Sequence, residues 1–196
     1  MSIQIRAIFF CLSLIILILI ISAPAANSIP EKSLHPMSVG ISLESAKMLP
    51  WKVSNRPGYG GTFQFQFDFN RYNSLISYIG FVFVGEDRFM PALPEMGHAK
   101  MRLFDIPFQI GLKRYFREND YRPFGTLTYG SHNMRKKYNY SEGTDPDFEH
   151  GLSSSVGIEK QIGSCWFLNS DLCLQAFPNH SYISFRIGLR YNVHMR

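Results

Sequence analysis

The sequence has few charged residues. Asp, Glu, Lys and Arg together make up 18% of its 196 residues, whereas soluble domains average about a quarter. Aromatic residues are abundant by contrast, at 15%. So little charge fits poorly with a water-exposed surface, which is normally dense in Lys and Glu.

Cysteine is also scarce, with three residues in the chain. Cys11 falls inside an apolar run near the amino terminus, which leaves Cys165 and Cys173. A strand that held both would separate them by about 26 Å, far beyond the roughly 7 Å that a disulfide allows between Cα atoms. We therefore expect two free thiols, unless a turn folds between them.

The chain has one long apolar run, "AIFFCLSLIILILIIS" at 7–22, which follows "MSIQIR" and precedes Ala23 and Ala25. This layout is typical of a secretory signal peptide. The run is shorter than the roughly 20 residues of a membrane-spanning helix, and an uncleaved anchor is the alternative. We expect a signal peptide at 1–25 and an amino-terminal extension at 26–37.

A helical period is missing after the signal peptide, and alternation with period two recurs instead. In "TFQFQFDFN", residues 62–70, every second residue is Phe, and on a strand these side chains share one face. Similar alternation predicts an all-β domain over 38–196. We expect eight strands, at 38–46, 62–70, 75–85, 102–116, 122–131, 151–162, 166–177 and 182–193.

The connections between these strands alternate in length. The long ones, at 49–60, 86–100 and 132–150, are separated by short ones, so all three emerge at the same end of an up-and-down meander. Outer-membrane barrels have this pattern, with short periplasmic turns and longer external loops. The fold class we predict is an eight-stranded antiparallel transmembrane β-barrel.

Alternation alone fits three architectures: a soluble sandwich, a lipocalin-like barrel with an apolar interior, and an outer-membrane barrel. The polar face favours the third, because it consists of Gly, Ser, Gln and Asn with a few charges of both signs. Eight strands enclose an interior just wide enough for side chains to fill. We therefore expect opposite charges to pair and plug the lumen. The expected charge network is Glu44, Asp68, Asp105, Lys113, Glu159, Asp171, Arg186 and Arg190.

The apolar face would then meet lipid. The expected lipid-facing residues are Phe63, Phe65, Phe67, Phe69, Phe104, Ile106, Phe108, Ile110, Phe185, Ile187 and Leu189. Aromatic residues near strand ends fit the interfacial girdles of such barrels. These are Trp51, Tyr59, Tyr72, Tyr115, Tyr121, Trp166 and Tyr182.

"LFDIPFQIGLKRYF" followed by "RPFGTLTYG" resembles paired strands of the porin-like outer-membrane protein β-barrel domain family. There an acidic residue, Ile and Pro open a strand that ends in basic and aromatic residues. "SFRIGLRYNV" is similar to the last strand of that family. The resemblance implies an eight-stranded barrel in a Gram-negative outer membrane, without a known catalytic site or cofactor, inserted by the barrel-assembly machinery. The chain departs from the family by ending in "HMR", and Pro107 predicts a bulge.

Motifs for catalysis or metal binding are sparse. No His is followed two residues later by Ser, the pair used by lipid A deacylases, and neither a CxxC pair nor a zinc spacing is present. "DPDFEH" at 145–150 is either a cation site or a solvated acidic tip. "RKKYNY" at 135–140 either contacts lipopolysaccharide phosphates or is a plain solvated loop. The net charge of +5 favours phosphorylated lipid headgroups over nucleic acid as a partner of an exported chain.

The sequence thus predicts a non-enzymatic outer-membrane barrel with a structural or binding role through its external loops. A soluble periplasmic barrel that binds an apolar ligand and a lipid A-modifying enzyme are the alternatives. The oligomeric state is not set by the sequence.

Overall fold

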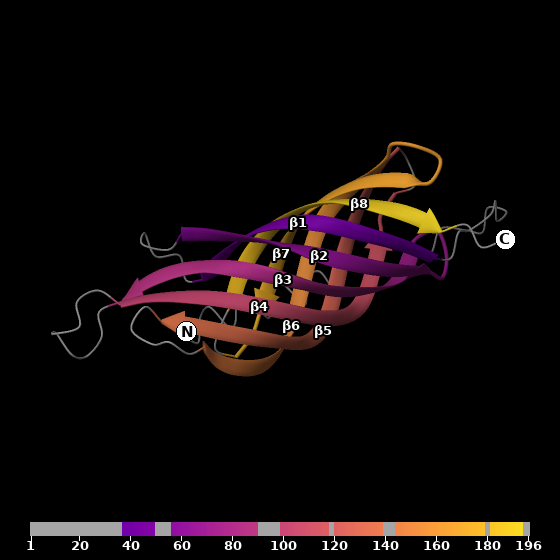
Figure 1. Cartoon of the computed structure of the whole chain (residues 1–196). Coiled ribbons are helices and arrows are strands. Elements are labelled where there is room, and N and C mark those ends of the chain that lie inside the picture. The colour runs from indigo at the N-terminus through magenta and orange to yellow at the C-terminus, as the bar shows by residue number, and fades with distance from the viewer. Residues whose placement is uncertain are drawn as a thin grey trace.

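A computed structural model describes residues 37–49, 56–89, 99–117, 120–138, 144–178 and 181–193. Eight antiparallel strands form a closed barrel in which each strand pairs with its neighbours in sequence and β8 returns to β1 (Figure 1). The predicted fold is confirmed, whereas the expected signal peptide lies outside the described residues. The strands are β1 (Met37–Leu49), β2 (Arg56–Asp68), β3 (Asn73–Phe89), β4 (Ala99–Tyr115), β5 (Tyr121–Tyr138), β6 (Thr144–Gln161), β7 (Trp166–Ala176) and β8 (Ser181–Val193).

The alternation in the sequence becomes an inner and an outer wall. Along β2, Phe65 and Phe67 are exposed and Gln64 and Gln66 are buried. The register continues this division, because Phe65 lies opposite Val39 of β1, which is also exposed. A slip of one residue would turn the phenylalanines into the barrel. The pairing register is therefore fixed by the pattern of side chains.

The strands β2 to β6 are longer than we expected, and β2 begins at Arg56, inside the expected connection 49–60. The segment 132–150 was expected to be a loop, but residues 132–138 continue β5 and residues 144–150 begin β6, with pairs from His132↔Glu149 to Lys137↔Thr144. Residues 86–89 and 99–100 likewise extend β3 and β4. Strand pairing satisfies the backbone groups of these segments even where their side chains are polar. The end of the barrel that carries these extensions is called the hairpin end below, and the opposite end is the turn end.

The extensions make the barrel taller on one side, and β3 and β4 reach past the other strands at the left of Figure 1. The pairing of β6 with β7 stops at Leu152↔Ala176, so residues 144–151 of β6 pair with β5 alone. This segment is an edge strand. Pro146 and the acidic residues around it suit an edge, because proline and charge both discourage pairing with another chain.

The bulge that we expected at Pro107 is absent. The β4–β5 register passes through Pro107↔His132 without a shift, and the β3–β4 register is the same at Ile79↔Phe108 and at Val82↔Asp105. Proline removes one ladder hydrogen bond, but it does not by itself add a residue to the strand. The register shift lies instead between Phe83 and Gly85 of β3.

Candidate functional site: a filled interior and an apolar outer wall

The interior near the turn end is organised around Glu159 of β6. Its carboxylate lies 3.0 Å from Lys113 Nζ, 2.7 Å from Arg190 Nη2 and 3.5 Å from Arg122 Nη1. The hydroxyl of Tyr115 donates to the same carboxylate at 3.0 Å. Glu159 and Lys113 are almost completely buried. Four neighbouring groups from β4, β5 and β8 therefore converge on one carboxylate.

A second ion pair fills the middle of the barrel. Arg186 of β8 donates to both carboxylate oxygens of Asp171 on β7, with Nε 3.1 Å from Oδ1. The guanidinium also lies over the ring of Tyr78, 4.7 Å from its centroid. Glu44 lies opposite Arg186 in the β1–β8 register and is buried. Arg186 thus lies between two carboxylates on its neighbouring strands, Asp171 on β7 and Glu44 on β1.

Asp105 contacts no basic residue of the expected network and instead binds His132. Its Oδ2 lies 2.6 Å from His132 Nδ1 and accepts a hydrogen bond from the Tyr182 hydroxyl at 2.7 Å. Gln109 Nε2 lies 2.8 Å from His132 Nε2 and donates to Gln175 Oε1 at 2.7 Å. We missed His132 because we placed it in a loop. The inward alternation Thr126, Thr128, His132 along β5 was the signal for its position.

Asp68 occupies a different place from the other expected charges. It is half-buried at the end of β2 near the turn end, where its Oδ1 accepts hydrogen bonds from Gln66 at 2.6 Å and from Ser74 at 2.5 Å. The structure therefore brings together Glu159, Lys113 and Arg190 in one cluster and Asp171 and Arg186 in another. Asp68 connects with the interior through amide and hydroxyl groups.

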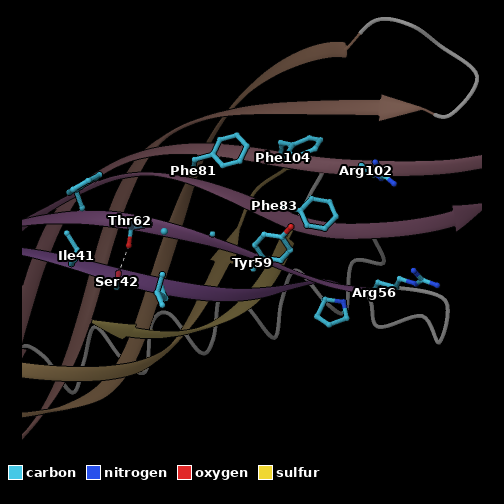
Figure 2. Close-up of a pocket in the computed structure, with 14 residues that line it drawn as sticks. Ile41, Ser42, Arg56, Tyr59, Thr62, Phe81, Phe83, Arg102 and Phe104 are labelled. Carbon is cyan, nitrogen blue, oxygen red and sulfur yellow. Dashed lines mark hydrogen bonds between the residues drawn. The ribbon is translucent and has the colours of Figure 1, made fainter. Parts of the chain in front are cut away.

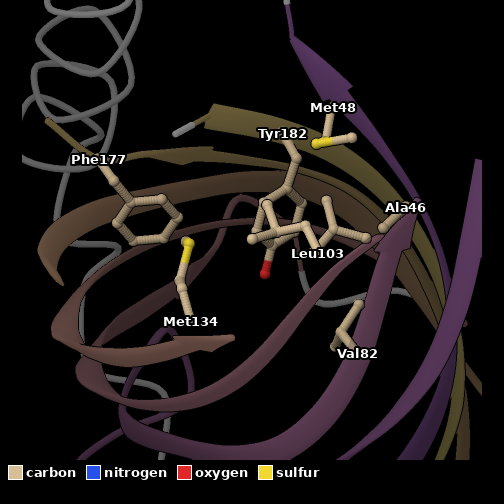
Figure 3. Packing of buried hydrophobic residues seen from close by; sticks show 8 residues of the cluster. Ala46, Met48, Val82, Leu103, Met134, Phe177 and Tyr182 are labelled. Carbon is tan, nitrogen blue, oxygen red and sulfur yellow. The ribbon is translucent and has the colours of Figure 1, made fainter. Parts of the chain in front are cut away.

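The interior at the hairpin end is apolar, which we did not expect. Val82, Leu103, Met134, Phe177 and Tyr182 pack together across the lumen, as Figure 3 shows. The apolar cluster consists of Ala46, Met48, Val82, Val84, Leu103, Met134, Phe177 and Tyr182. It explains why the third strand is apolar on both faces, since Val82 and Val84 point inward while Phe81 is exposed. Buried side chains therefore occupy the interior at the levels of the two ion pairs and of this cluster.

The outer wall is a belt of exposed apolar side chains. Phe65 is 52% exposed and Ile187 is 49% exposed, on strands that lie on either side of β1. Phe104 and Ile106 are half-buried on the same wall, and Phe69 lies just beyond the end of β2. The exposed members of the set expected to face lipid are Phe63, Phe65, Phe67, Phe69, Phe108, Ile110, Phe185, Ile187 and Leu189.

Two of the aromatic residues that we assigned to interfacial girdles lie inside the barrel. Tyr115 is buried against Glu159, and Tyr182 is buried in the apolar cluster. Position near a strand end does not decide the wall, because the wall alternates with every residue. Tyr59, Tyr121 and Trp166 are exposed, whereas Trp51 lies outside the described residues.

The described residues of the two polar motifs of the expected third loop lie on strands, 135–138 on β5 and 145–150 on β6. Glu149 is buried and His150 is exposed, so these two residues of "DPDFEH" lie on opposite walls of β6. Within the described residues, no three His, Cys, Asp or Glu side chains come together as a metal site would require. Arg135 and Lys137 of "RKKYNY" are both exposed on β5. Cys165 and Cys173 are free thiols.

Comparison with solved structures matches the closed barrel to known proteins. Neisserial surface protein A aligns with a TM-score of 0.58 at 10% identity, over 83% of this chain and 100% of that protein. Ail, the attachment invasion locus protein of Yersinia pestis, in complex with the heparin analogue sucrose octasulfate, aligns with a TM-score of 0.51 at 12% identity, over 79% of this chain and 95% of that protein. This is the fold of the small outer-membrane β-barrels. At these identities the similarity concerns the fold alone.

No family model matches the sequence, and no curated protein matches it. The resemblance to the porin-like barrel family is therefore supported through the fold and not through a sequence match. In the part of the chain that the structure describes, no helix has the length and apolarity needed to cross a membrane.

Proposed function

We propose that this chain is an integral outer-membrane β-barrel with a structural or binding role, whose hairpin end faces the outside of the cell. One observation carries the proposal: the belt of exposed apolar side chains surrounds an interior that is polar and charged at its middle and its turn end, with an apolar cluster only at the hairpin end. A soluble lipocalin-like barrel would have the opposite arrangement, with apolar side chains around an internal ligand. Burial of the belt in hydrocarbon removes the exposed apolar area from water, while each ladder hydrogen bond is satisfied within the closed sheet.

We further propose that the barrel does not conduct solutes. Glu159 and Lys113 are fully buried in a direct ion pair, and Asp171 and Arg186 form another above them. The apolar cluster closes the hairpin end. A path for water or ions would require the charges to separate, and a buried charge without its partner costs several kcal/mol.

The binding role is assigned to the hairpin end, where exposed basic residues gather. Arg102 on β4 pairs with Lys137 on β5. Two residues closer to the centre of the barrel, Arg135 of β5 pairs with Phe104 of β4. Arg56 opens β2 at the same end. These residues stand where the belt ends, at the expected level of the lipid headgroups. Their charge favours anionic headgroups such as those of lipopolysaccharide.

Fractionation of cells that produce the chain tests the location. We expect the protein in the outer-membrane fraction, extractable only with detergent, with a gel mobility that changes on heating because the closed barrel resists denaturation by detergent. Release by osmotic shock, together with a mobility that heating does not alter, would contradict the proposal and favour the soluble barrel.

The proposal includes no catalytic activity. A lipid-facing hydrolase would need a nucleophile and a hydrogen-bonded base. Its activity would be detected as a change in the structure of lipid A. Mass spectra of lipid A from cells that overproduce the protein are expected to equal those of control cells. A new lipid A species that has lost or gained an acyl chain would show that the chain is an enzyme.

A further inference from the structure

The outer wall contains a groove of about 840 Å³ across β1 to β4 near the hairpin end (Figure 2). The groove exists because Gly61 lacks a side chain. Gly61 of β2 pairs with Leu43 of β1 and with Phe81 of β3. The side chains of both partners are exposed and apolar. At the next outward positions of β2 on either side, Tyr59 and Phe63 carry aromatic rings.

Aromatic rings form one wall of this groove. The rings of Phe81 and Phe104 are 5.9 Å apart, those of Phe83 and Phe104 are 5.3 Å apart, and those of Tyr59 and Phe83 are 5.9 Å apart. Figure 2 shows these four residues on neighbouring strands, along the side of the groove. The volume lies within the range of roughly 300–1,000 Å³ that is typical of ligand pockets. The groove is therefore large enough to hold an elongated apolar group.

The hairpin end of the groove is basic. Arg56 and Arg102 line it there and are both exposed. In the strand register Glu86 lies between them, and Lys137 follows Arg102 on β5. This row contains three basic residues and one acidic residue, so its charge is positive. Arginine binds phosphate oxygens through two parallel hydrogen bonds, which makes it the preferred residue for such a headgroup.

We propose that the groove binds lipid A, with one acyl chain along Gly61 and a phosphate at Arg56 and Arg102. This inference rests on the proposed function, which places the hairpin end in the outer leaflet. An apolar groove with a basic end matches an amphiphile that has acyl chains and a phosphorylated headgroup. A lipid without net negative charge would fill the groove but would complement the positive charge of its basic end less well. The site is distinct from the interior network, since it lies on the outer wall.

Two kinds of variant test the two halves of the site. Arg56→Gln with Arg102→Gln removes the charge, and Gly61→Val fills the groove. A Cβ at Gly61 meets only the backbone oxygen of Ser42, at 3.3 Å, so β1 must shift by a few tenths of an ångström to admit it. Gly61→Ala is the milder version. The matched controls lie at the turn end: Lys160→Gln, which is exposed, and Gly163→Val, where a Cβ meets nothing nearer than 3.9 Å.

Each purified, detergent-solubilised variant is titrated with diphosphoryl lipid A, and with phosphatidylcholine as a second probe, and bound lipid is counted by native mass spectrometry. We expect wild type to prefer lipid A. The double arginine variant should lose about ten-fold or more in affinity for lipid A, because charge-assisted contacts are the strong ones, and should lose the salt dependence of binding. Gly61→Val should weaken lipid A binding while the salt dependence remains.

Lipid A affinities that are unchanged in both the arginine and the glycine variants would overturn the inference, as would equal losses in the two controls. Binding of phosphatidylcholine as tightly as lipid A by wild type would overturn it too, because the arginines would then select nothing. The change of gel mobility on heating is recorded for every variant. A wild-type protein that is in the outer membrane and heat-modifiable but shows no preference for lipid A refutes this inference alone. A protein recovered by osmotic shock refutes the proposed function itself.

Discussion

At the scale of single residues, the interior depends on an uneven balance of charge. Glu159 is one carboxylate with three basic neighbours, Lys113, Arg122 and Arg190. Lys113 also lies 4.1 Å from the centroid of the Phe124 ring, and Arg190 lies 4.2 Å from that of Phe167. The cations are therefore stabilised both by the carboxylate of Glu159 and by these aromatic rings. The carboxylate has no comparable substitute, so its loss should cost more than the loss of any one cation.

Glu159→Gln is therefore expected to lower the free energy of unfolding by about 3–5 kcal/mol, the usual cost of leaving a buried charge unpaired. Lys113→Met should cost clearly less, since Arg190 and Arg122 still face Glu159 and the methionine fills much of the same volume. Urea unfolding in phospholipid vesicles, followed by tryptophan fluorescence, measures both. Equal losses for the two variants would show that the cluster does not depend on Glu159.

At the scale of strands, alternation predicted eight strands and the wall on which most side chains lie. It succeeded from Phe63 to Phe67 of β2 and from Ile183 to Leu189 of β8, where every second residue is Phe, Ile or Leu. It failed at the hairpin end of β5 and β6, where charged and polar residues such as Arg135 and Lys137 resemble a loop in composition. Their strand structure comes from pairing with a neighbour, which composition does not contain. The contact of His132 with Asp105 joins the neighbouring strands β5 and β4. It was missed because His132 was assigned to a loop, so its pairing register with β4 was not considered.

The outer wall makes an element-level prediction at the middle of β8. Ile187→Arg is expected to cost about 2–4 kcal/mol in vesicles, because a cation at the midplane of the hydrocarbon is poorly solvated. Tyr121→Arg, at the turn end of β5, should cost about 0–1 kcal/mol, since it lies near the interface. The urea midpoints of the two variants provide the comparison. Similar midpoints would mean that Ile187 does not face hydrocarbon.

At the scale of the whole molecule, the barrel has two unlike ends. The turn end has short connections, and the hairpin end has the extensions of β3 to β6. Cys165, which lies between β6 and β7 at the turn end, is partly exposed, whereas Cys173 is buried in the interior. The native thiols can therefore report which end of the barrel faces which side of the membrane.

A membrane-impermeant maleimide applied to intact cells is expected to leave Cys165 unlabelled and to label it once the outer membrane is permeabilised. Lys137→Cys, on the exposed wall at the hairpin end, should be labelled in intact cells. Cys173 should react only after unfolding. Labelling of Cys165 in intact cells, with Lys137→Cys protected, would reverse the proposed orientation.

The buried side chains of the interior predict that the barrel conducts no ions in planar bilayers. Wild type should give no conductance steps, because the two ion pairs and the apolar cluster lie in the interior at successive levels. Opening the apolar cluster alone, with Met134→Ser, should not produce steps, since the ion pairs remain. Regular steps from wild-type protein would show that the interior rearranges in the bilayer.

The pairing of the last strand, β8, also determines when Arg190 and Glu159 form their ion pair. Arg190 of β8 contacts Glu159 on β6 and donates to Ser38 Oγ on β1 at 3.0 Å. Before β8 pairs with β1, the sheet is open and Arg190 lacks its contact with Ser38. The ion pair of Arg190 with Glu159 is then not enclosed by the barrel. Closing the cylinder and satisfying its charges are thus a single event, so the chain has an electrostatic reason to remain shut once assembled.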